Sequence, residues 1–290
     1  MSRFHTAALF GKRDSAAVIE ALALLREHLL RRGVNVLVDA DLSGAAALAA
    51  SCVDIATIRQ RAAVAIVVGG DGTLLSAARK LGAADVPLVG INQGRLGFMT
   101  DIARADMLGA LDRLLAGEFT PDARMRLDVR VMRGGVEVFR TLALNEVVVG
   151  KGDLGRMIEL EVRVDGEFLY VLRADGMIVA TPSGSTAYAL SANGPILQPT
   201  VPGIALVPLC AHGLTYRPIT ITDRSVVELR LIPSYDGRVH CDGQNFFDAK
   251  AGDSVLLTRS QHPLTLLHPP GYSYFAMLRE KLHWSATPHR

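Results

Sequence analysis

Cysteine, excess charge and long apolar runs are all scarce in this chain of 290 residues, and each scarcity excludes a class of protein. The three cysteines (Cys52, Cys210 and Cys241) are odd in number and widely spaced, so they predict neither a disulfide framework nor a zinc site. The eight histidines lack metal-type spacing as well, and we expect no metal site built from protein side chains.

The charge balance and the short apolar runs exclude further partners. A net charge of +2 gives no reason to expect nucleic acid or an anionic membrane surface as the main partner. No uncharged apolar stretch reaches the ~18 residues that a membrane span needs, and the apolar run near the N-terminus is too short for a signal peptide. We therefore expect a cytoplasmic protein with no nucleic-acid partner and no membrane partner.

What the chain does contain is a large apolar fraction: 49% of its residues are hydrophobic and 21% are charged, which is typical of a folded protein. At about 150 residues per domain, its length predicts two domains. The first part alternates short apolar strands with amphipathic helices, as an α/β domain does. We expect strands at residues 6–10, 35–38, 64–68 and 88–91, and helices at residues 15–32, 74–81 and 105–116.

The pattern changes near Thr120 and Pro121, where strand-like runs separated by turn signals take over. We expect strands at residues 126–132, 136–144, 157–164, 167–172, 225–232, 238–241 and 254–258, one helical interruption at residues 185–191, and a helical tail at residues 274–282. The fold class is therefore an α/β N-terminal domain (residues 1–122) followed by an all-β sandwich (residues 123–265). Residues 266–290 form a C-terminal segment that we expect to return to the first domain.

The segment Gly69-Gly70-Asp71-Gly72-Thr73 directly follows the apolar strand at residues 64–68 and precedes a helix. Ligands of open α/β sheets bind beyond the carboxyl ends of the strands, and a helix N-terminus with nearby glycines suits phosphate. Leu75 excludes the G-x-G-x-x-G pattern, and Thr73 replaces the lysine of a Walker A loop. An acid repels phosphate, so Asp71 is a candidate base or metal-ligand partner, the alternative being an ordinary turn residue.

Two further segments combine polar groups with small residues. Asn145 and Glu146 interrupt the apolar run LALNEVVVG, where they form either a strand end or a site for a sugar diol. The stretch TPSGSTAYALS is dense in hydroxyls, and Ser183 or Ser185 is expected to cap the helix that follows. Tyr188 in the same stretch is available to stack on a base.

The chain resembles the NAD kinase family over residues 6–284. The pentapeptide GGDGT alone is also similar to the signatures of diacylglycerol-type lipid kinases and 6-phosphofructokinases. The Asn145–Glu146 pair, the segment DGMIVATPSGSTAY at residues 175–188, HGLTYRPI at residues 212–219, Asp242-Gly243-Gln244 and the ending HPPGYSYFAMLREKLHW favour the NAD kinases. A lipid kinase would not be expected to carry the second of these segments, and an NAD(P)-sensing module without activity could dispense with Asp71.

The resemblance implies an activity and a set of site residues. The activity is transfer of the γ-phosphoryl group of ATP, bound with Mg²⁺ or another divalent cation, to the 2′-hydroxyl of the adenosine ribose of NAD. NAD would lie in the cleft between the two domains, and Asp71 would be the base. The residues implied in binding are Gly70, Asp71, Gly72, Thr73, Phe98, Asn145, Glu146, Arg156, Arg173, Asp175, Ser183, Thr186, Ala187, Tyr188, Ser191, Ala211 and Gln244.

Three positions depart from the family pattern. Ser183 stands where threonine is usual, Asn193 where glycine is usual and Ala211 where proline is frequent. The first keeps its hydroxyl, whereas Asn193 could alter a tight turn. The resemblance also implies a homodimer or homotetramer in which Asp175 and Arg173 reach the NAD held by Asn145 and Tyr188 of a neighbour. A mean hydropathy of +0.26 is consistent with a buried subunit contact.

Overall fold

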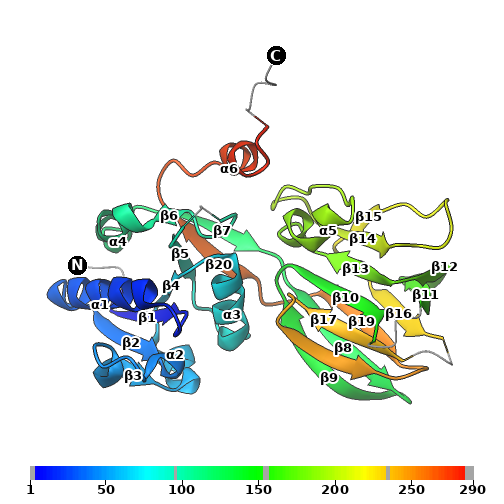
Figure 1. The fold of residues 1–290 in the computed structure, drawn as a ribbon, viewed down its shortest axis with the longest axis horizontal. Helices are drawn as coiled ribbons and strands as arrows, with labels where there is room; N and C mark the ends of the chain where they lie inside the picture. The colour runs from blue at the N-terminus through cyan, green and yellow to red at the C-terminus, as the bar shows by residue number, and fades with distance from the viewer. Residues whose placement is uncertain (1–3, 95–96, 153–156, 233–235, 285–290) are drawn as a thin grey trace. The chain divides into compact units, whose positions relative to one another are not determined.

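The computed structural model describes residues 4–94, 97–152, 157–232 and 236–284, and these residues divide into two compact units (Figure 1). The first unit comprises Met1–Ala123 together with Leu264–Arg290, and the second comprises Arg124–Pro263. Within the described part of the chain, no helix is both long and apolar enough to cross a membrane.

The first unit is an α/β unit built on one eight-stranded sheet in the order β3-β2-β1-β4-β5-β20-β7, with β6 paired to β5. Its strands are β1 (Thr6–Gly11), β2 (Asn35–Asp39), β3 (Cys52–Val53), β4 (Val64–Val68), β5 (Leu88–Asn92), β6 (Ile102–Ala103), β7 (Thr120–Arg124) and β20 (Leu264–His268). Strands β1 to β5 pair in parallel, and β20 also joins β5 in parallel although it comes from the far end of the sequence. The chain moves from β1 outward to β3 and then back to β4, which makes the β1–β4 junction the point where the strand order reverses.

The helices of this unit are α1 (Ala16–Arg31), α2 (Ile55–Arg61), α3 (Asp71–Leu81), α4 (Met107–Leu115) and α6 (Tyr274–Lys281). The expected limits of α1 are confirmed: the Ser15 hydroxyl accepts the N–H of Val18 at 3.4 Å, and Gly33 follows the helix with a φ of 75°. Helix α3 begins three residues before the expected Leu74, because the glycine-rich segment itself forms its first turn. Helix α2 and strand β20 were not indicated by the sequence patterns.

The second unit is a sandwich of two antiparallel six-stranded sheets, as expected. One sheet has the order β15-β14-β13-β10-β17-β18, and its strands are β10 (Glu146–Lys151), β13 (Gly176–Ala180), β14 (Gly203–Leu209), β15 (Ile219–Thr222), β17 (Gly237–Cys241) and β18 (Asn245–Ala249). The other has the order β12-β11-β16-β19-β8-β9, and its strands are β8 (Leu127–Arg133), β9 (Val136–Ala143), β11 (Ile158–Val164), β12 (Glu167–Ala174), β16 (Val227–Leu231) and β19 (Ser254–Arg259).

Alternation of side chains builds the core of this sandwich. Leu127, Val129 and Val131 of β8 are fully buried, and the intervening residues are more exposed. The β8–β9 hairpin turns at Gly134 and Gly135 with φ values of 57° and 82°, a conformation that glycine adopts without steric cost. The helical interruption is a 3₁₀ turn (Gly184–Thr186) followed by the short α5 (Tyr188–Ser191).

Candidate active site

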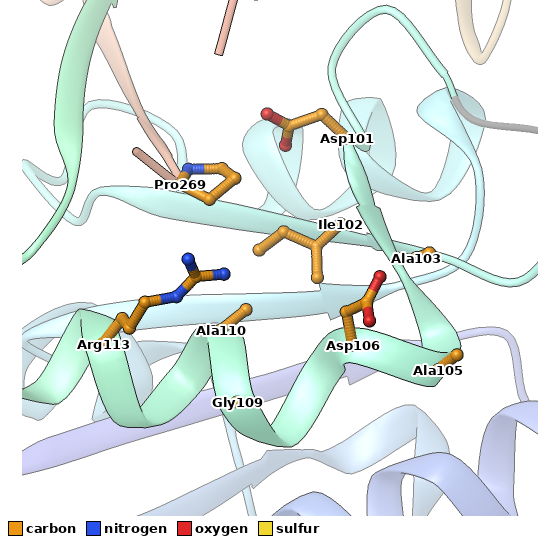
Figure 2. A pocket seen from close by; sticks show the side chains of 9 residues that line it. All are labelled: Asp101, Ile102, Ala103, Ala105, Asp106, Gly109, Ala110, Arg113 and Pro269. Carbon is orange, nitrogen blue, oxygen red and sulfur yellow. The ribbon is translucent and has the colours of Figure 1, made fainter. Parts of the chain in front are cut away.

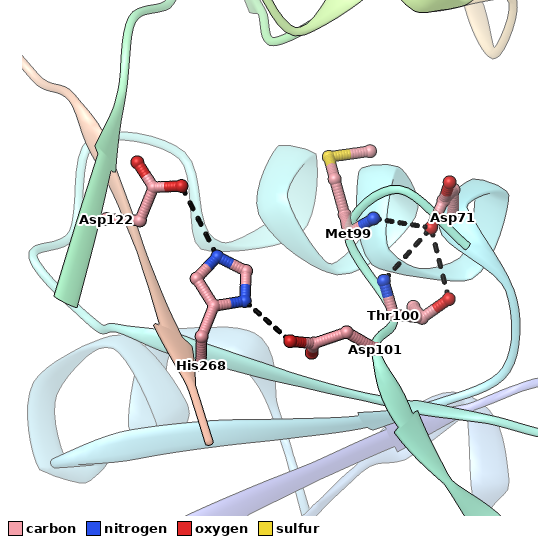
Figure 3. A network of polar contacts seen from close by, with 6 residues as sticks. All are labelled: Asp71, Met99, Thr100, Asp101, Asp122 and His268. Atoms are coloured by element: carbon pink, nitrogen blue, oxygen red, sulfur yellow. Dashed lines mark hydrogen bonds and ion pairs between the residues drawn. The ribbon is translucent and has the colours of Figure 1, made fainter. Parts of the chain in front are cut away.

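The carboxylate of Asp71 lies at the first residue of α3, immediately beyond the carboxyl end of β4. Its Oδ2 accepts the N–H of Phe98 at 2.8 Å. Its Oδ1 accepts the N–H groups of Met99 and Thr100 and the Thr100 hydroxyl, each at 3.1 Å (Figure 3). Four donors thus hold the carboxylate in one orientation, and the segment of residues 97–100 closes around it. We call this arrangement the Asp71 cradle.

Two neighbouring residues explain how the segment of residues 97–100 packs so closely against the Asp71 carboxylate. A Cβ atom at Gly97 would collide with Oδ1 of Asp71, so only glycine allows this approach. Thr100 is fully buried, and its hydroxyl also accepts the Asn92 side-chain amide at 2.9 Å. The cradle is therefore built from the carboxyl ends of two neighbouring parallel strands, β4 and β5, as the rule for open α/β sheets predicts.

The predicted phosphate-loop residues all lie at the start of α3. Gly70 is the N-cap residue, with φ of −98° and ψ of −176°, and Gly72 and Thr73 belong to the first turn. The N–H of Thr73 donates to the carbonyl of Gly70 at 2.9 Å. The N-terminus of α3 carries a partial positive charge, which favours a phosphate at this end of the helix.

In the second unit, Asn145 directly precedes β10 and Glu146 is its first residue. Asp242, in the turn between β17 and β18, holds this chain segment through its carboxylate. The Asp242 Oδ1 accepts the N–H groups of Asn145 at 2.7 Å and Glu146 at 3.1 Å, and its Oδ2 accepts the N–H of Leu144 at 2.8 Å. The Asp-Gly pair predicted the turn, but the contact with Asn145 comes from the tertiary fold alone.

The side chains of Asn145 and Glu146 are both buried, with 7% of each residue exposed. Oδ1 of Asn145 and Oε2 of Glu146 are enclosed and receive no donor from the described residues. Burial, followed by the negative charge of Asp242, raises the pKa of the Glu146 carboxyl to about 8. Enclosed polar atoms without donors are uncommon and point to a ligand or water that completes them.

The hydroxyl-rich segment folds over Asn145. Thr181, the residue after β13, donates its N–H to the Asn145 carbonyl at 2.9 Å and its hydroxyl to the Leu144 carbonyl at 2.6 Å. A Cβ atom at Gly184 would collide with the Asn145 carbonyl, so the turn at Gly184 requires glycine. The segment therefore serves first to brace the Asn145–Glu146 pair.

The expectation that Ser183 or Ser185 caps the following helix is wrong. Ser183 is the N-cap residue of the 3₁₀ turn, but its side chain makes no capping bond, and α5 begins after Ala187 without a side-chain cap. The Ser183 hydroxyl instead accepts Nη1 of Arg124 at 3.2 Å. The fully buried Ser185 hydroxyl donates to the carbonyl of Pro182 at 2.6 Å and accepts the N–H of Leu197 at 2.9 Å, because a buried hydroxyl requires partners.

The remaining residues of this segment lie on its outer side. Thr186 bonds the Ser183 carbonyl through its hydroxyl at 3.1 Å, Ala187 links the 3₁₀ turn to α5, and Tyr188 and Ser191 are exposed. Asn193, which stands where glycine is usual, has a φ of 59°. Asparagine is among the few residues that tolerate this conformation, so the substitution preserves the turn.

Arg173 and Asp175 lie elsewhere in the second unit. In the β10–β13 ladder Glu146 pairs with Ala180 and Gly150 pairs with Gly176, so Asp175, the residue before Gly176, lies beyond the opposite end, about 17 Å along the strand from Glu146. Asp175 pairs with Lys151 at 3.0 Å, and Arg173 is 3.9 Å from Glu159. Ala211 is half-buried and Gln244 is exposed in the β17–β18 turn, whereas Arg156 lies outside the described residues.

The described part of the first unit includes cavities on two of its sides. One, of about 840 Å³, lies at the carboxyl ends of β1 and β2 and includes Arg13, Ile19, Ala23 and Leu42 among its lining residues. The other, of about 380 Å³, lies between α4 and the segment after β20, with Asp101, Arg113 and Pro269 on its walls (Figure 2). No predicted site residue lines either cavity.

Comparisons with known proteins define the class first. The family model described as the ATP-NAD kinase N-terminal domain matches residues 9–119, and the one described as the ATP-NAD kinase C-terminal domain matches residues 144–268. These two models together describe a two-domain phosphotransferase.

Individual relatives narrow this class. The chain is similar to the NAD kinase of Aromatoleum aromaticum, with 55% identity covering 99% of this chain and 96% of the relative, and to that of an Azoarcus species, with 54% identity covering 99% and 98%. A solved NAD kinase from Archaeoglobus fulgidus in complex with ATP has a TM-score of 0.74 and 26% identity, covering 96% of this chain and 98% of that one. Yeast NADH kinase complexed with NADH has the same fold, with a TM-score of 0.91 at 23% identity over 98% of this chain and 89% of that one. The chain belongs to the NAD kinase family.

Proposed function

We propose that this chain transfers the γ-phosphoryl group of ATP to the 2′-hydroxyl of the adenosine ribose of NAD, with Asp71 as the base that takes the hydroxyl proton. Membership of the NAD kinase family makes the chain a phosphotransferase. The observation that carries the role of Asp71 is its cradle: a carboxylate held by four donors at the start of α3. The predicted alternative, an ordinary turn residue, would not need such a cradle.

A base at this position would make the ribose hydroxyl a better nucleophile. A sugar hydroxyl is a poor nucleophile at neutral pH, and a fixed carboxylate within hydrogen-bond reach can accept its proton as the new bond forms. The cradle fixes the carboxylate before substrate arrives, so little reorganisation is needed during the reaction. Among the described residues Oδ2 accepts only the N–H of Phe98, so it keeps the greater capacity to accept a hydroxyl.

Asn145 and Glu146 are proposed to bind the hydroxyls of an NAD ribose. A diol offers both a donor and an acceptor on neighbouring carbons, which suits an amide beside a carboxyl group. The enclosed Oδ1 of Asn145 and Oε2 of Glu146 support this role, because ligand donors would satisfy them. Binding of donors would also favour the charged form of Glu146, so NAD binding is expected to release a proton.

ATP is proposed to use the first unit. The cavity at the carboxyl ends of β1 and β2 offers the apolar side chains of Ile19 and Leu42 to a nucleoside. Arg13 lines it together with the carboxylates of Asp14, Glu20 and Asp41, so a triphosphate there would need its divalent cation to offset the negative charge. We propose that a divalent cation enters with the triphosphate, whose oxygens are ligands that Mg²⁺ prefers. Such a cation, when bound, would neutralise the charge of the transferred phosphoryl group.

We also propose that the active unit is a homodimer or homotetramer with shared sites. Asp175 lies about 17 Å along the β10–β13 ladder from Glu146, and Arg173 lies on β12 of the other sheet. Neither residue is therefore at the end of the ladder that holds Glu146. This separation supports a site in which Asp175 and Arg173 act on the NAD held by a neighbouring subunit.

A product assay tests the proposed reaction. Purified protein is incubated with ATP, Mg²⁺ and NAD, and the product is offered to a dehydrogenase that accepts only NADP. The 2′-phosphate is expected on the adenosine ribose, so the dehydrogenase should reduce the product. Phosphate on the nicotinamide ribose, or on added diacylglycerol, would refute the assignment.

A further inference from the structure

His268, the last residue of β20, is enclosed between two carboxylates. Its Nδ1 lies 2.8 Å from Oδ2 of Asp101, and its Nε2 lies 3.3 Å from Oδ2 of Asp122 on β7 (Figure 3). The side chain of His268 is 1% exposed and that of Asp101 is 4% exposed. Each ring nitrogen of His268 therefore faces a carboxylate oxygen, one from Asp101 and one from Asp122.

The ring is also fixed in its plane. Tyr272 stacks on His268 with ring centroids 3.7 Å apart and an angle of 4° between the planes. His268 and Tyr272 both belong to the C-terminal segment that joins the first unit through β20. The ring therefore has little freedom to leave Asp101.

Asp101 connects this ring to the cradle. It directly follows Thr100, whose N–H and hydroxyl both donate to Oδ1 of Asp71. On the other side Asp101 precedes the short strand β6, which pairs with β5. The backbone of residues 99–100 is thus held at one end by the Asp71 carboxylate and at the other by a residue whose side chain is anchored on His268.

We propose that His268 is a positioning residue for phosphoryl transfer: by binding the Asp101 carboxylate it keeps the N–H groups of Met99 and Thr100 on Asp71. The proposal rests on the proposed role of Asp71 as the base. His268 itself touches no reacting atom. Loss of the His268–Asp101 contact lets residues 99–101 drift, and Asp71 then loses the donors that orient it.

Two substitutions at His268 separate this role from simple packing. The amide nitrogen of asparagine is as many bonds from Cβ as Nδ1, so His268→Asn retains a donor for Asp101. The amide nitrogen of glutamine corresponds to Nε2, so His268→Gln retains a donor for Asp122 alone. Both variants lose the ring and its stack on Tyr272. Asparagine is one methylene smaller than glutamine, so packing alone would make His268→Asn the more damaging change, which is opposite to the order expected here.

The experiment measures kcat, the two KM values and amide hydrogen exchange of residues 98–101 in full-length protein. In His268→Gln we expect kcat to fall by up to about a hundredfold, with KM values for NAD and ATP nearly unchanged and faster exchange at Met99 and Thr100. In His268→Asn we expect kcat and exchange close to those of the unmodified protein. If His268→Gln does not fold, Asp101→Ala removes the same contact from the other side and should give the same two changes.

Equal effects of the two His268 variants on kcat, or unchanged exchange at Met99 and Thr100 in both His268→Gln and Asp101→Ala, would overturn the proposal. Failure of the proposed function is recognised separately, by an Asp71→Asn variant that keeps normal turnover. The exchange measurement requires no catalysis, so it tests the contact with the cradle in either case.

Discussion

The carboxylate of Asp242 accepts a hydrogen bond from the main-chain N–H of Glu146, but its negative charge repels the Glu146 carboxylate. Oδ1 of Asp242 accepts the N–H of Glu146 at 3.1 Å, and the Asp242 charge adds to burial in raising the pKa of the Glu146 carboxyl to about 8. The acid that holds the backbone of Asn145 and Glu146, the proposed sugar site, is thus also one reason why Glu146 resists ionisation.

The stability of the protein should therefore depend on pH through Glu146. Its pKa is about 8 when folded and 4.5 when unfolded, so folding favours the protonated form. The contribution is fully present below pH 4.5 and is lost as pH rises through 8, with a slope of at most about 1.4 kcal/mol per pH unit. Urea unfolding of the ligand-free protein and of Glu146→Gln across this range should show the difference, whereas parallel curves would contradict it.

NAD affinity should respond to pH in the opposite direction. Ribose hydroxyls that donate to Glu146 favour its ionised form, so binding releases a proton wherever the free carboxyl is protonated. The affinity is expected to rise by up to about tenfold per pH unit below pH 8 and to level off above it. Calorimetry in buffers of different ionisation enthalpy measures the proton release, and Glu146→Gln should abolish it.

Replacement of the proposed base should separate catalysis from binding. Asp71→Asn retains one acceptor oxygen for the cradle but loses the basic carboxylate, so turnover is expected to fall by about two or more orders of magnitude. NAD affinity should change little, whereas the melting temperature should fall, because the new amide NH₂ group faces at least one donor of the cradle. Asp85→Asn, at an exposed acid of the same unit, serves as the control and should leave turnover intact. Near-normal turnover in Asp71→Asn would exclude Asp71 as the base.

Shared sites predict complementation between inactive subunits. Asp71→Asn and Asp175→Ala are each expected to be inactive, but mixed oligomers contain some sites with both residues intact, so activity should partly return on subunit exchange. Mixing Asp71→Asn with Asp71→Ala provides the control, because no combination restores the base. Absence of recovery despite demonstrated exchange, or a monomer by light scattering, would refute shared sites.

Filling the cavity beside β1 and β2 should weaken the binding of ATP and leave the binding of NAD unchanged. Ala23 lines this cavity, whereas its neighbour Leu24 is 42% exposed on another face of α1. Ala23→Trp should raise the KM for ATP severalfold and leave NAD affinity unchanged, and Leu24→Trp should leave both unchanged. Equal KM values for ATP in the two variants would place the donor nucleoside elsewhere.

Much of the fold was predictable because its signals are local. An apolar strand at residues 64–68, a glycine-rich turn and a helix follow one another directly in the sequence, so the position of Asp71 at a strand–helix junction required no knowledge of distant residues. Hairpins marked by Gly134-Gly135 and Asp165-Gly166 were predictable for the same reason, since turn conformation depends on the residues of the turn itself.

The support of the site was not predictable in this way. Asp242 reaches Asn145 across 97 positions of sequence, and His268 reaches Asp101 across 167. An Asp-Gly turn and a histidine before two prolines carry no local sign of these partners, because the contacts arise only when separate strands enter the same sheet. The sequence by itself thus determined the family, the two kinds of domain and the candidate base. The tertiary structure alone decided which buried groups hold the proposed base and the proposed sugar pair in place, because enclosure and charge depend on neighbours that folding brings together.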